Sequence, residues 1–246
     1  MRRIQVAGLA LAVVLIGVTI AVFAIPSVLN GPICGGGVYN AKVGSMIGVD
    51  LGQPFYNLTF TKNGVQDWGF YYGFMSSSMS WIKANTPSGS LFMNWWDYGK
   101  EIVGCTGRSS VISNTSARLV ALGFSSGRNP ERDPDQALTD VGTILFTTNA
   151  TLAHSMASKY GASYLLVTVE DGGEKAPYIL RYLGLEPSEY FISNSTGVTN
   201  PPGGFSSGSW TALGQRTVVY KLLDSQSVPG FVQIYSDSNV KIFSVG

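Results

Sequence analysis

The sequence predicts a mixed α/β globular domain of α+β type, which follows one transmembrane helix and ends in a β-rich tail. Near the N-terminus, residues 4–25 form a nearly continuous apolar run. Further on, a helical pattern over residues 149–160 is closed by Gly161 and followed by the apolar, β-branched run 164–169. The order helix, glycine, strand is typical of an α/β layer. The tail contains three β-like runs, at residues 216–223, 230–235 and 240–245.

Residues 1–26 are predicted to be a membrane anchor. Residues 4–25 are apolar apart from Gln5 and Thr19, and as a helix they would span about 33 Å, enough for a hydrocarbon core of about 30 Å. Arg2 and Arg3 precede the run, so the positive-inside rule predicts a cytoplasmic N-terminus and an extracytoplasmic remainder. The alternative is a cleaved signal peptide, with a tolerable cleavage site at residues 22–24.

Two segments follow the anchor. Residues 27–64 are rich in glycine and are predicted to be an irregular connector, and residues 65–246 are predicted to be the external globular domain. A helix is expected to begin near residues 65–67 and to end before Pro87, because apolar side chains recur at steps of three and four residues. These side chains are Trp68, Tyr71, Met75, Met79 and Ile82.

The remaining elements are expected in the following order. Short strands are predicted at residues 91–93 and 108–112, a helix at 115–122, a polar loop at 124–133, helices at 134–146 and 149–160, a buried strand at 164–169, a helix at 177–183 and a surface loop at 193–208. Residues 236–239 are expected to form the hairpin turn between the last two β-like runs.

Composition excludes several classes of function. The net charge is +1 and charged residues make up 13% of the chain. The protein therefore has no strong electrostatic field that would attract nucleic acid. The only histidine, His154, has no predictable catalytic partner, and no Cys/His metal spacing or phosphate-binding loop is present. The two cysteines, Cys34 and Cys105, could pair in an oxidising compartment. No complete catalytic set is apparent.

The most unusual stretch is residues 94–100, which contain adjacent tryptophans directly after the predicted strand 91–93. Trp95 and Trp96 carry hydrogen-bond donors, an ionised Asp97 accepts, Tyr98 does both, and Gly99 lets the backbone turn. This combination predicts an aromatic-walled pocket that binds a small hydroxyl group. The alternative is a core aromatic cluster with an aspartate that caps a loop.

The run Trp95-Trp96-Asp97-Tyr98-Gly99 resembles the signature of the catalytic subunit of oligosaccharyltransferase, the membrane enzyme of protein N-glycosylation. Other segments look like segments of the same family, and the archaeal branch of that family is the most similar in its general sequence pattern. These segments are Trp68 and residues 81–87, 159–167, 219–223 and 230–236. The resemblance covers roughly residues 66–243.

The resemblance implies that Trp95, Trp96 and Asp97 bind the Ser or Thr hydroxyl of an acceptor sequon, Asn-X-Ser/Thr. A second family motif, Asp-x-x-Lys-x-x-x-Met/Ile, is matched by Lys175 and Ile179, and its last residue contacts the Thr methyl group. The acid departs from the pattern, because Gly172 stands three residues before Lys175 and Asp171 lies one residue earlier.

The resemblance also implies partners. The complete family enzyme holds a divalent metal, Mg or Mn, and a lipid-linked oligosaccharide in a polytopic membrane portion, and no counterpart of either site is expected in this chain. The chain alone is therefore expected to be catalytically incomplete, with a separate or missing membrane portion and an acceptor polypeptide as partners. The alternatives are a membrane-anchored sequon-binding protein without transferase activity, or an anchored surface protein. Sequons at Asn57, Asn114, Asn149 and Asn194 are compatible with an external glycoprotein.

Overall fold

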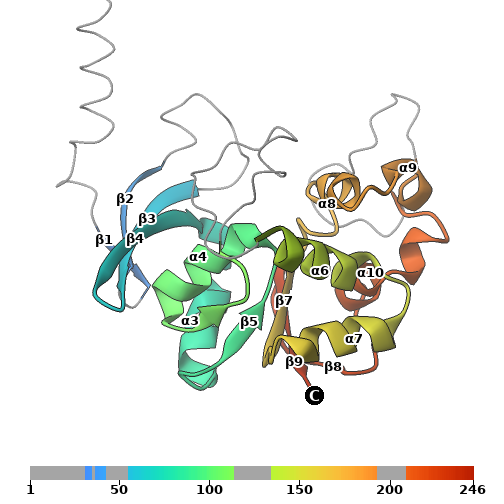
Figure 1. The fold of residues 1–246 in the computed structure, drawn as a ribbon. Helices are drawn as coiled ribbons and strands as arrows, with labels where there is room; N and C mark the ends of the chain where they lie inside the picture. Colours follow the sequence, from blue (N-terminus) through green and yellow to red (C-terminus); the bar gives the residue numbers. More distant parts are fainter. Residues whose placement is uncertain (1–30, 35–36, 43–54, 114–133, 193–208) are drawn as a thin grey trace, which may run out of the picture.

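The protein is described here by a computed structural model covering residues 31–34, 37–42, 55–113, 134–192 and 209–246 (Figure 1). The predicted anchor 1–26, the helix at 115–122 and the loops at 124–133 and 193–208 lie outside the described residues. Within the described ranges, no helix has both the length and the apolar character needed to cross a membrane.

The first described part is a four-stranded antiparallel sheet in the order β1-β2-β3-β4. Its strands are β1 Gly31–Cys34, β2 Gly37–Lys42, β3 Phe55–Lys62 and β4 Val65–Tyr72. The prediction of an irregular connector over 27–64 was therefore wrong for three of its segments, which form β1, β2 and β3. Cys105 is disulfide-bonded, and Cys34, the only other cysteine of the sequence, ends β1.

The prediction that a helix begins near residue 65 was also wrong, because residues 65–72 form β4. Asn63 and Gly64 take positive φ angles of 51° and 78°, the backbone of a tight hairpin turn. β3 and β4 pair without interruption from Phe55 opposite Tyr72 to Lys62 opposite Val65. The predicted helix is confirmed only further on, as the single turn η1 Gly73–Met75 and the helix α3 Ser76–Asn85.

A second, five-stranded mixed sheet in the order β6-β5-β7-β9-β8 forms the centre of the molecule. Its strands are β5 Leu91–Met93, β6 Ser109–Ser110, β7 Tyr164–Thr168, β8 Phe231–Ser236 and β9 Val240–Val245. β5 runs parallel to β6 and to β7, whereas β9 is antiparallel to both of its neighbours. The strands predicted at 91–93, 164–169, 230–235 and 240–245 are confirmed, and the one predicted at 108–112 is present in shorter form.

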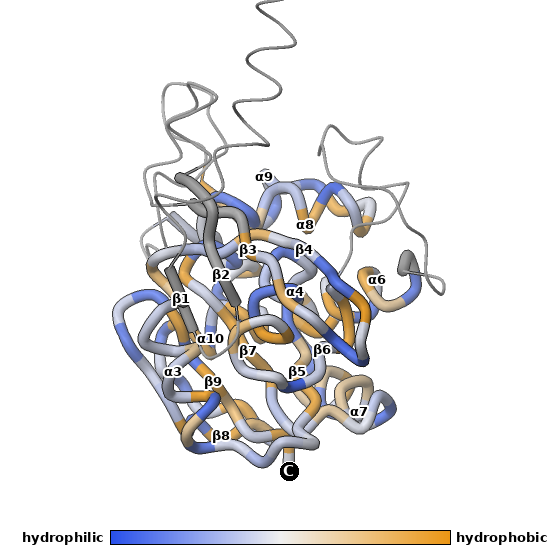
Figure 2. Tube along the Cα trace, turned by 90° about the vertical axis from the view of Figure 1, so that its left-hand side faces the viewer, coloured by the Kyte–Doolittle hydropathy of each residue, from blue (hydrophilic) through white to orange (hydrophobic). Residues whose placement is uncertain are grey.

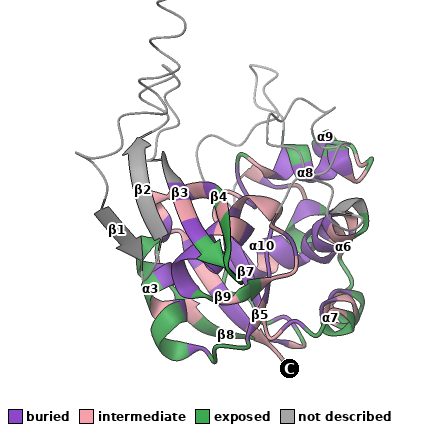
Figure 3. Cartoon of the chain, turned by 60° about the vertical axis from the view of Figure 1, so that its left-hand side comes forward, coloured by how far each residue is buried: buried purple, intermediate pink, exposed green. Residues whose placement is uncertain are grey.

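Helices cover both faces of this sheet, with α3 on one side and α6, α7 and α10 on the other (Figure 1). Their bounds are α6 Pro134–Phe146, α7 Ala150–Lys159, α8 Ala176–Tyr182, α9 Pro187–Tyr190, the short turn η5 Gly214–Arg216 and α10 Val218–Leu223. Hydrophobic residues gather along β7 and α10 (Figure 2), and the outer turns of α3 and α7 are exposed (Figure 3).

The β-like run predicted at 216–223 is in fact the helix α10. The Thr217 hydroxyl caps it by accepting a hydrogen bond from the Tyr220 amide. Val218, Val219, Leu222 and Leu223 are buried, and their spacing places them on one face of a helix. Burial of that face outweighs the strand preference of its two valines. The predicted C-terminal cap of α7 is confirmed, since Gly161 has a φ of +68°.

Candidate functional site

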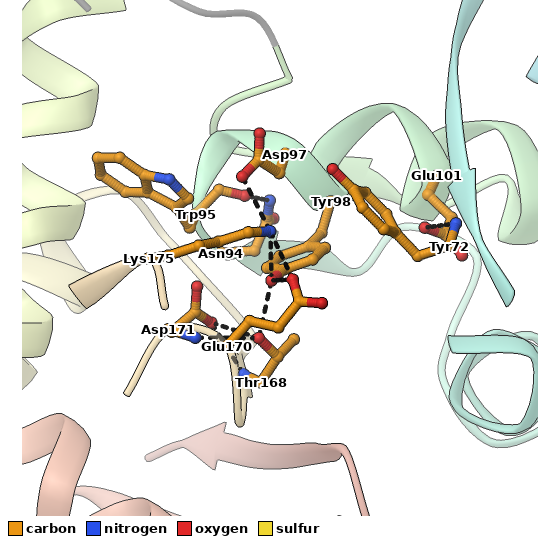
Figure 4. Close-up of polar contacts among 10 residues, drawn as sticks. All are labelled: Tyr72, Asn94, Trp95, Asp97, Tyr98, Glu101, Thr168, Glu170, Asp171 and Lys175. Carbon is orange, nitrogen blue, oxygen red and sulfur yellow. Dashed lines mark hydrogen bonds and ion pairs between the residues drawn. The ribbon is translucent and has the colours of Figure 1, made fainter. Parts of the chain in front are cut away.

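Two segments that are far apart in the sequence meet at the carboxyl ends of two inner strands of the central sheet. β5 leads into Asn94 and Trp95 and then into the turn η2 Trp96–Tyr98, and β7 leads into the loop before α8. Because β5 and β7 are parallel neighbours, their carboxyl ends lie side by side, the usual position for binding groups on such sheets. Residues 94–98 and the segment that carries Lys175 therefore face each other (Figure 4).

Lys175 occupies the centre of this arrangement. Its Nζ lies 2.9 Å from Asp97 Oδ2 and 2.8 Å from Glu170 Oε2, and it donates to the Tyr98 hydroxyl over 2.7 Å. An ammonium group has three donors, so these three acceptors saturate it. The same Nζ lies 4.1 Å from the centre of the Tyr98 ring and 4.9 Å from that of Tyr72, within the range of cation–π attraction.

The environment of Lys175 favours its charged form. Burial alone would lower the Lys175 pKa, but Asp97, followed by the two tyrosines and Glu170, raises it well above its usual value. Burial raises the pKa of Asp97, and Lys175 partly offsets that effect. The side chains of Lys175 and Asp97 are 15% and 11% exposed, so the ion pair is largely withdrawn from solvent and fixes the orientation of the aspartate.

Tyr98 extends the network to the end of β7. Its hydroxyl lies 2.8 Å from Thr168 Oγ1 and also donates to Glu170 Oε2 over 3.1 Å. Asp171 Oδ2 accepts from the Thr168 amide over 2.8 Å and from its hydroxyl over 3.2 Å. Burial raises the pKa of Asp171 to about 7. Although its spacing departs from the family motif, Asp171 lies in the cluster, where it holds the strand end in place.

Ile179 and Gly99 have packing roles. Ile179 is fully buried in α8, and a Cβ built on Gly142 of α6 would lie 3.3 Å from its Cγ2. A Cβ on Gly99 would lie 2.0 Å from the carbonyl oxygen of Ile112, so only glycine fits there. Both residues are buried.

The tryptophans differ in their exposure. Trp95 is 3% exposed and belongs to the hydrophobic core, where it makes an edge contact with Tyr182. Trp96 is half-buried. The indole N–H groups of Trp95 and Trp96 form no hydrogen bond with a described residue, and neither does the Oδ1 atom of Asp97. The indole nitrogen of Trp95 is not fully buried. The Trp95 ring thus agrees with the alternative of a core aromatic cluster, while its indole N–H makes no hydrogen bond to a described residue.

Several residues of the site were not predicted from the sequence. Glu170 directly follows the predicted strand 164–169, a position that sequence could have indicated. Tyr72 gave no such signal, because its segment was interpreted as helical. Glu101 is fully buried, its Oε2 accepts from the Tyr72 amide over 3.1 Å, and burial raises its pKa well above the usual value. Asn94 fixes the cluster by donating to the Trp95 carbonyl and accepting from the Ser110 hydroxyl.

Comparison with known proteins finds a local similarity in sequence and a likeness to solved structures. No protein-family model matches the chain. A stretch of 79 residues, 30% of this chain, is 30% identical to the dolichyl-diphosphooligosaccharide–protein glycosyltransferase subunit stt3 of Schizosaccharomyces pombe. The chain is related to the catalytic subunit of oligosaccharyltransferase. The aligned stretch spans 10% of the length of the S. pombe subunit.

Solved oligosaccharyltransferase structures are also similar to the chain. The C-terminal globular domain of an enzyme from Archaeoglobus fulgidus matches with a TM-score of 0.47 and 18% identity, over 69% of this chain and 95% of that domain. The A. fulgidus oligosaccharyltransferase tethered to an acceptor peptide with an NVT sequon matches with a TM-score of 0.47 and 16% identity, over 65% of this chain and 23% of that one.

The metal expected of a complete oligosaccharyltransferase does not fit the described residues. Nowhere in them do three or more His, Cys, Asp or Glu side chains gather in a way that could hold a metal ion. Two acids of the site, Asp97 and Glu170, are both neutralised by Lys175. We therefore derive no chemical step through a metal from this part of the chain.

Proposed function

We propose that this chain is the acceptor-recognition part of an oligosaccharyltransferase, which binds the Ser or Thr hydroxyl of an Asn-X-Ser/Thr sequon. The observation that carries the proposal is the fixed orientation of Asp97. Lys175 holds Asp97 Oδ2 at 2.9 Å, and the second carboxylate oxygen makes no hydrogen bond to a described residue. The adjacent indole N–H groups of Trp95 and Trp96 are likewise uncommitted among the described residues.

These groups match the chemistry of a hydroxyl. A hydroxyl both donates and accepts a hydrogen bond. Asp97 therefore accepts a hydrogen bond from the hydroxyl, and an indole N–H donates one to the hydroxyl oxygen. A peptide without the hydroxyl leaves these groups unpaired, and sites of this kind discriminate by about 10⁴-fold. Tyr98 and Lys175 orient Asp97, and Gly99 permits the close packing of the turn. The contact of Ile179 with a Thr methyl group, worth about 0.8 kcal/mol, stays a prediction.

The transfer step is assigned to a polytopic membrane portion, in a separate chain or in upstream sequence. That portion would hold the divalent metal, Mg or Mn, and the lipid-linked oligosaccharide. The anchor predicted at residues 1–26 would place the recognition domain on the extracytoplasmic side, beside an emerging acceptor polypeptide. No nucleic acid is involved, in keeping with the net charge of +1.

A peptide-binding experiment tests the proposal. The full chain in detergent is titrated with an Asn-X-Thr peptide and with its Asn-X-Ala analogue, as wild type, as Asp97→Asn and as the surface control Glu189→Gln. We expect the wild type and the control to prefer the Thr peptide by at least about tenfold, and Asp97→Asn to lose that preference. Equal binding of both peptides by the wild type would overturn the sequon assignment.

A second measurement separates the transferase from its alternative. The chain is purified from its host membranes under mild conditions, and the proteins that accompany it are identified. A polytopic partner, or additional helices in the same chain, supports the transferase. Selective peptide binding by a chain that purifies alone, with no further helices, instead supports a membrane-anchored sequon-binding protein without transferase activity.

A further inference from the structure

Of the four sequons, the one at Asn149 is the one whose side chains the structure describes. Asn149 is exposed in the connection between α6 and α7, with extended backbone angles of φ −98° and ψ 100°. Thr151, the hydroxyl residue of this sequon, is exposed on the first turn of α7. The periphery of the molecule at α7 is open to solvent (Figure 3).

The two polar atoms of the Asn149 side chain have different roles. Its Oδ1 accepts a hydrogen bond from the Leu152 amide over 3.1 Å and so caps α7. Its Nδ2 makes no hydrogen bond to a described residue. A sugar attached to Nδ2 would leave Oδ1 in place, so the helix cap and a glycan are compatible at this residue.

The surface beside Asn149 also suits a sugar. Leu152 is 42% exposed, which makes it one of the larger apolar side chains on the described surface. It lies one helical turn from the Asn149 side chain and is linked to it through the capping bond. The apolar face of a first sugar ring could cover this leucine and remove part of its surface from water.

We propose that Asn149 carries an N-linked oligosaccharide. In the reaction the bond between sugar C1 and the phosphate oxygen of a lipid-linked oligosaccharide breaks, and a bond between C1 and Nδ2 forms. The lipid phosphate leaves with the electron pair, and Nδ2 releases one proton to the solvent. Because residues 150 and 151 are helical in the folded chain, the bond forms on the extended chain before α7 folds.

The inference rests on the proposed function in one respect, namely that the domain faces a compartment in which N-glycosylation takes place. The test is mass spectrometry of the segment containing Asn149, from full chain produced in its own host. Three variants accompany the wild type. Thr151→Ser keeps the sequon, Thr151→Ala destroys it without touching the cap, and Asn149→Asp keeps a capping oxygen but removes Nδ2.

We expect sugar mass on the segment in the wild type and in Thr151→Ser, and complete loss of it in Thr151→Ala and Asn149→Asp. An unmodified Asn149 in the wild type overturns this inference, whatever the peptide-binding result is. A glycosylated Asn149 in a chain that binds Thr and Ala peptides equally keeps the inference and overturns the proposed function instead. The two failures are therefore distinguishable.

Discussion

Lys175 and Asp97 form an ion pair of 2.9 Å across the ends of two neighbouring parallel strands. The same lysine neutralises Glu170, so two carboxylates share one cation. Either acid without the lysine would be left facing the other with no compensating charge. The folded structure and the candidate site consequently depend on the same ammonium group, which leads to the first prediction.

Lys175→Met is expected to lower the free energy of unfolding by about 3–5 kcal/mol, because it leaves two largely buried carboxylates unpaired. Urea denaturation at pH 7 measures the change. Lys159→Met is the matched control, since that lysine is 67% exposed and lies 3.6 Å from Asp140. Asp140 keeps its hydrogen bonds from Gln136 and Tyr160 without it, so the loss should cost about 1 kcal/mol or less. Equal effects of the two substitutions would contradict a structural role for Lys175.

Tyr98→Phe is expected to destabilise the protein by about 1–3 kcal/mol, because it removes the hydroxyl that accepts from Lys175 and contacts Thr168. Tyr164→Phe serves as the control: this tyrosine is half-buried, and its hydroxyl has no hydrogen bond to a described residue. Thermal unfolding of both variants gives the comparison. If Tyr164→Phe costs as much as Tyr98→Phe, the network around Lys175 contributes nothing beyond ring packing.

Asp171→Asn is expected to change how stability depends on pH. The usual pKa of an aspartate is about 3.9, and burial raises that of Asp171 to about 7. Between these values the folded protein binds more protons than the unfolded chain, so the free energy of unfolding falls as pH rises. Asparagine binds no proton in this range, and its Oδ1 can still accept from the Thr168 amide.

Denaturant titrations between pH 4 and 8 measure this difference. The variant should show a shallower decline than the wild type, by at most about 1.4 kcal/mol per pH unit. Identical slopes would mean that Asp171 ionises as easily in the folded protein as in the unfolded chain.

Gly99→Ala is expected to lower the free energy of unfolding by about 1–3 kcal/mol, the usual cost of overpacking. Its Cβ would lie 2.0 Å from the Ile112 carbonyl oxygen and 2.6 Å from Ser113 Cα, and both are backbone atoms that cannot move aside cheaply. Gly89→Ala is the control, since nothing lies within 4 Å of its Cβ. Urea denaturation of the pair tests the packing role, and a harmless Gly99→Ala would refute it.

The sequence predicted the central sheet well, because its longer strands are rich in β-branched and aromatic residues. In residues 164–169 these form a contiguous apolar run. It failed for β4 and α10, where local preference and tertiary context disagree. The aromatic residues of β4 satisfy both a two-residue and a three-to-four-residue period, and only pairing with β3 decides between them. In α10 the valines favour a strand, but the Thr217 cap and the buried face impose a helix.

The site was predictable in its chemistry but not in its extent. The residue types of 95–99 indicated a hydrogen-bonding cluster, and the family resemblance added Lys175. Tyr72 could not be found in this way, because its contribution depends on the hairpin of β3 and β4 bringing a ring within 4.9 Å of Lys175. Glu101 was equally hidden, since its role is a contact with the Tyr72 backbone.

The position of Tyr72 bears on where the domain can be cut. A recombinant fragment starting at α3 would contain the whole five-residue signature and the Lys175 loop, yet it would lack one aromatic wall around the ammonium group and the amide that pairs with Glu101. Because β4 is held along its full length by β3, both strands must be retained. The shortest self-sufficient unit therefore begins ahead of residue 55, well upstream of residues 95–99.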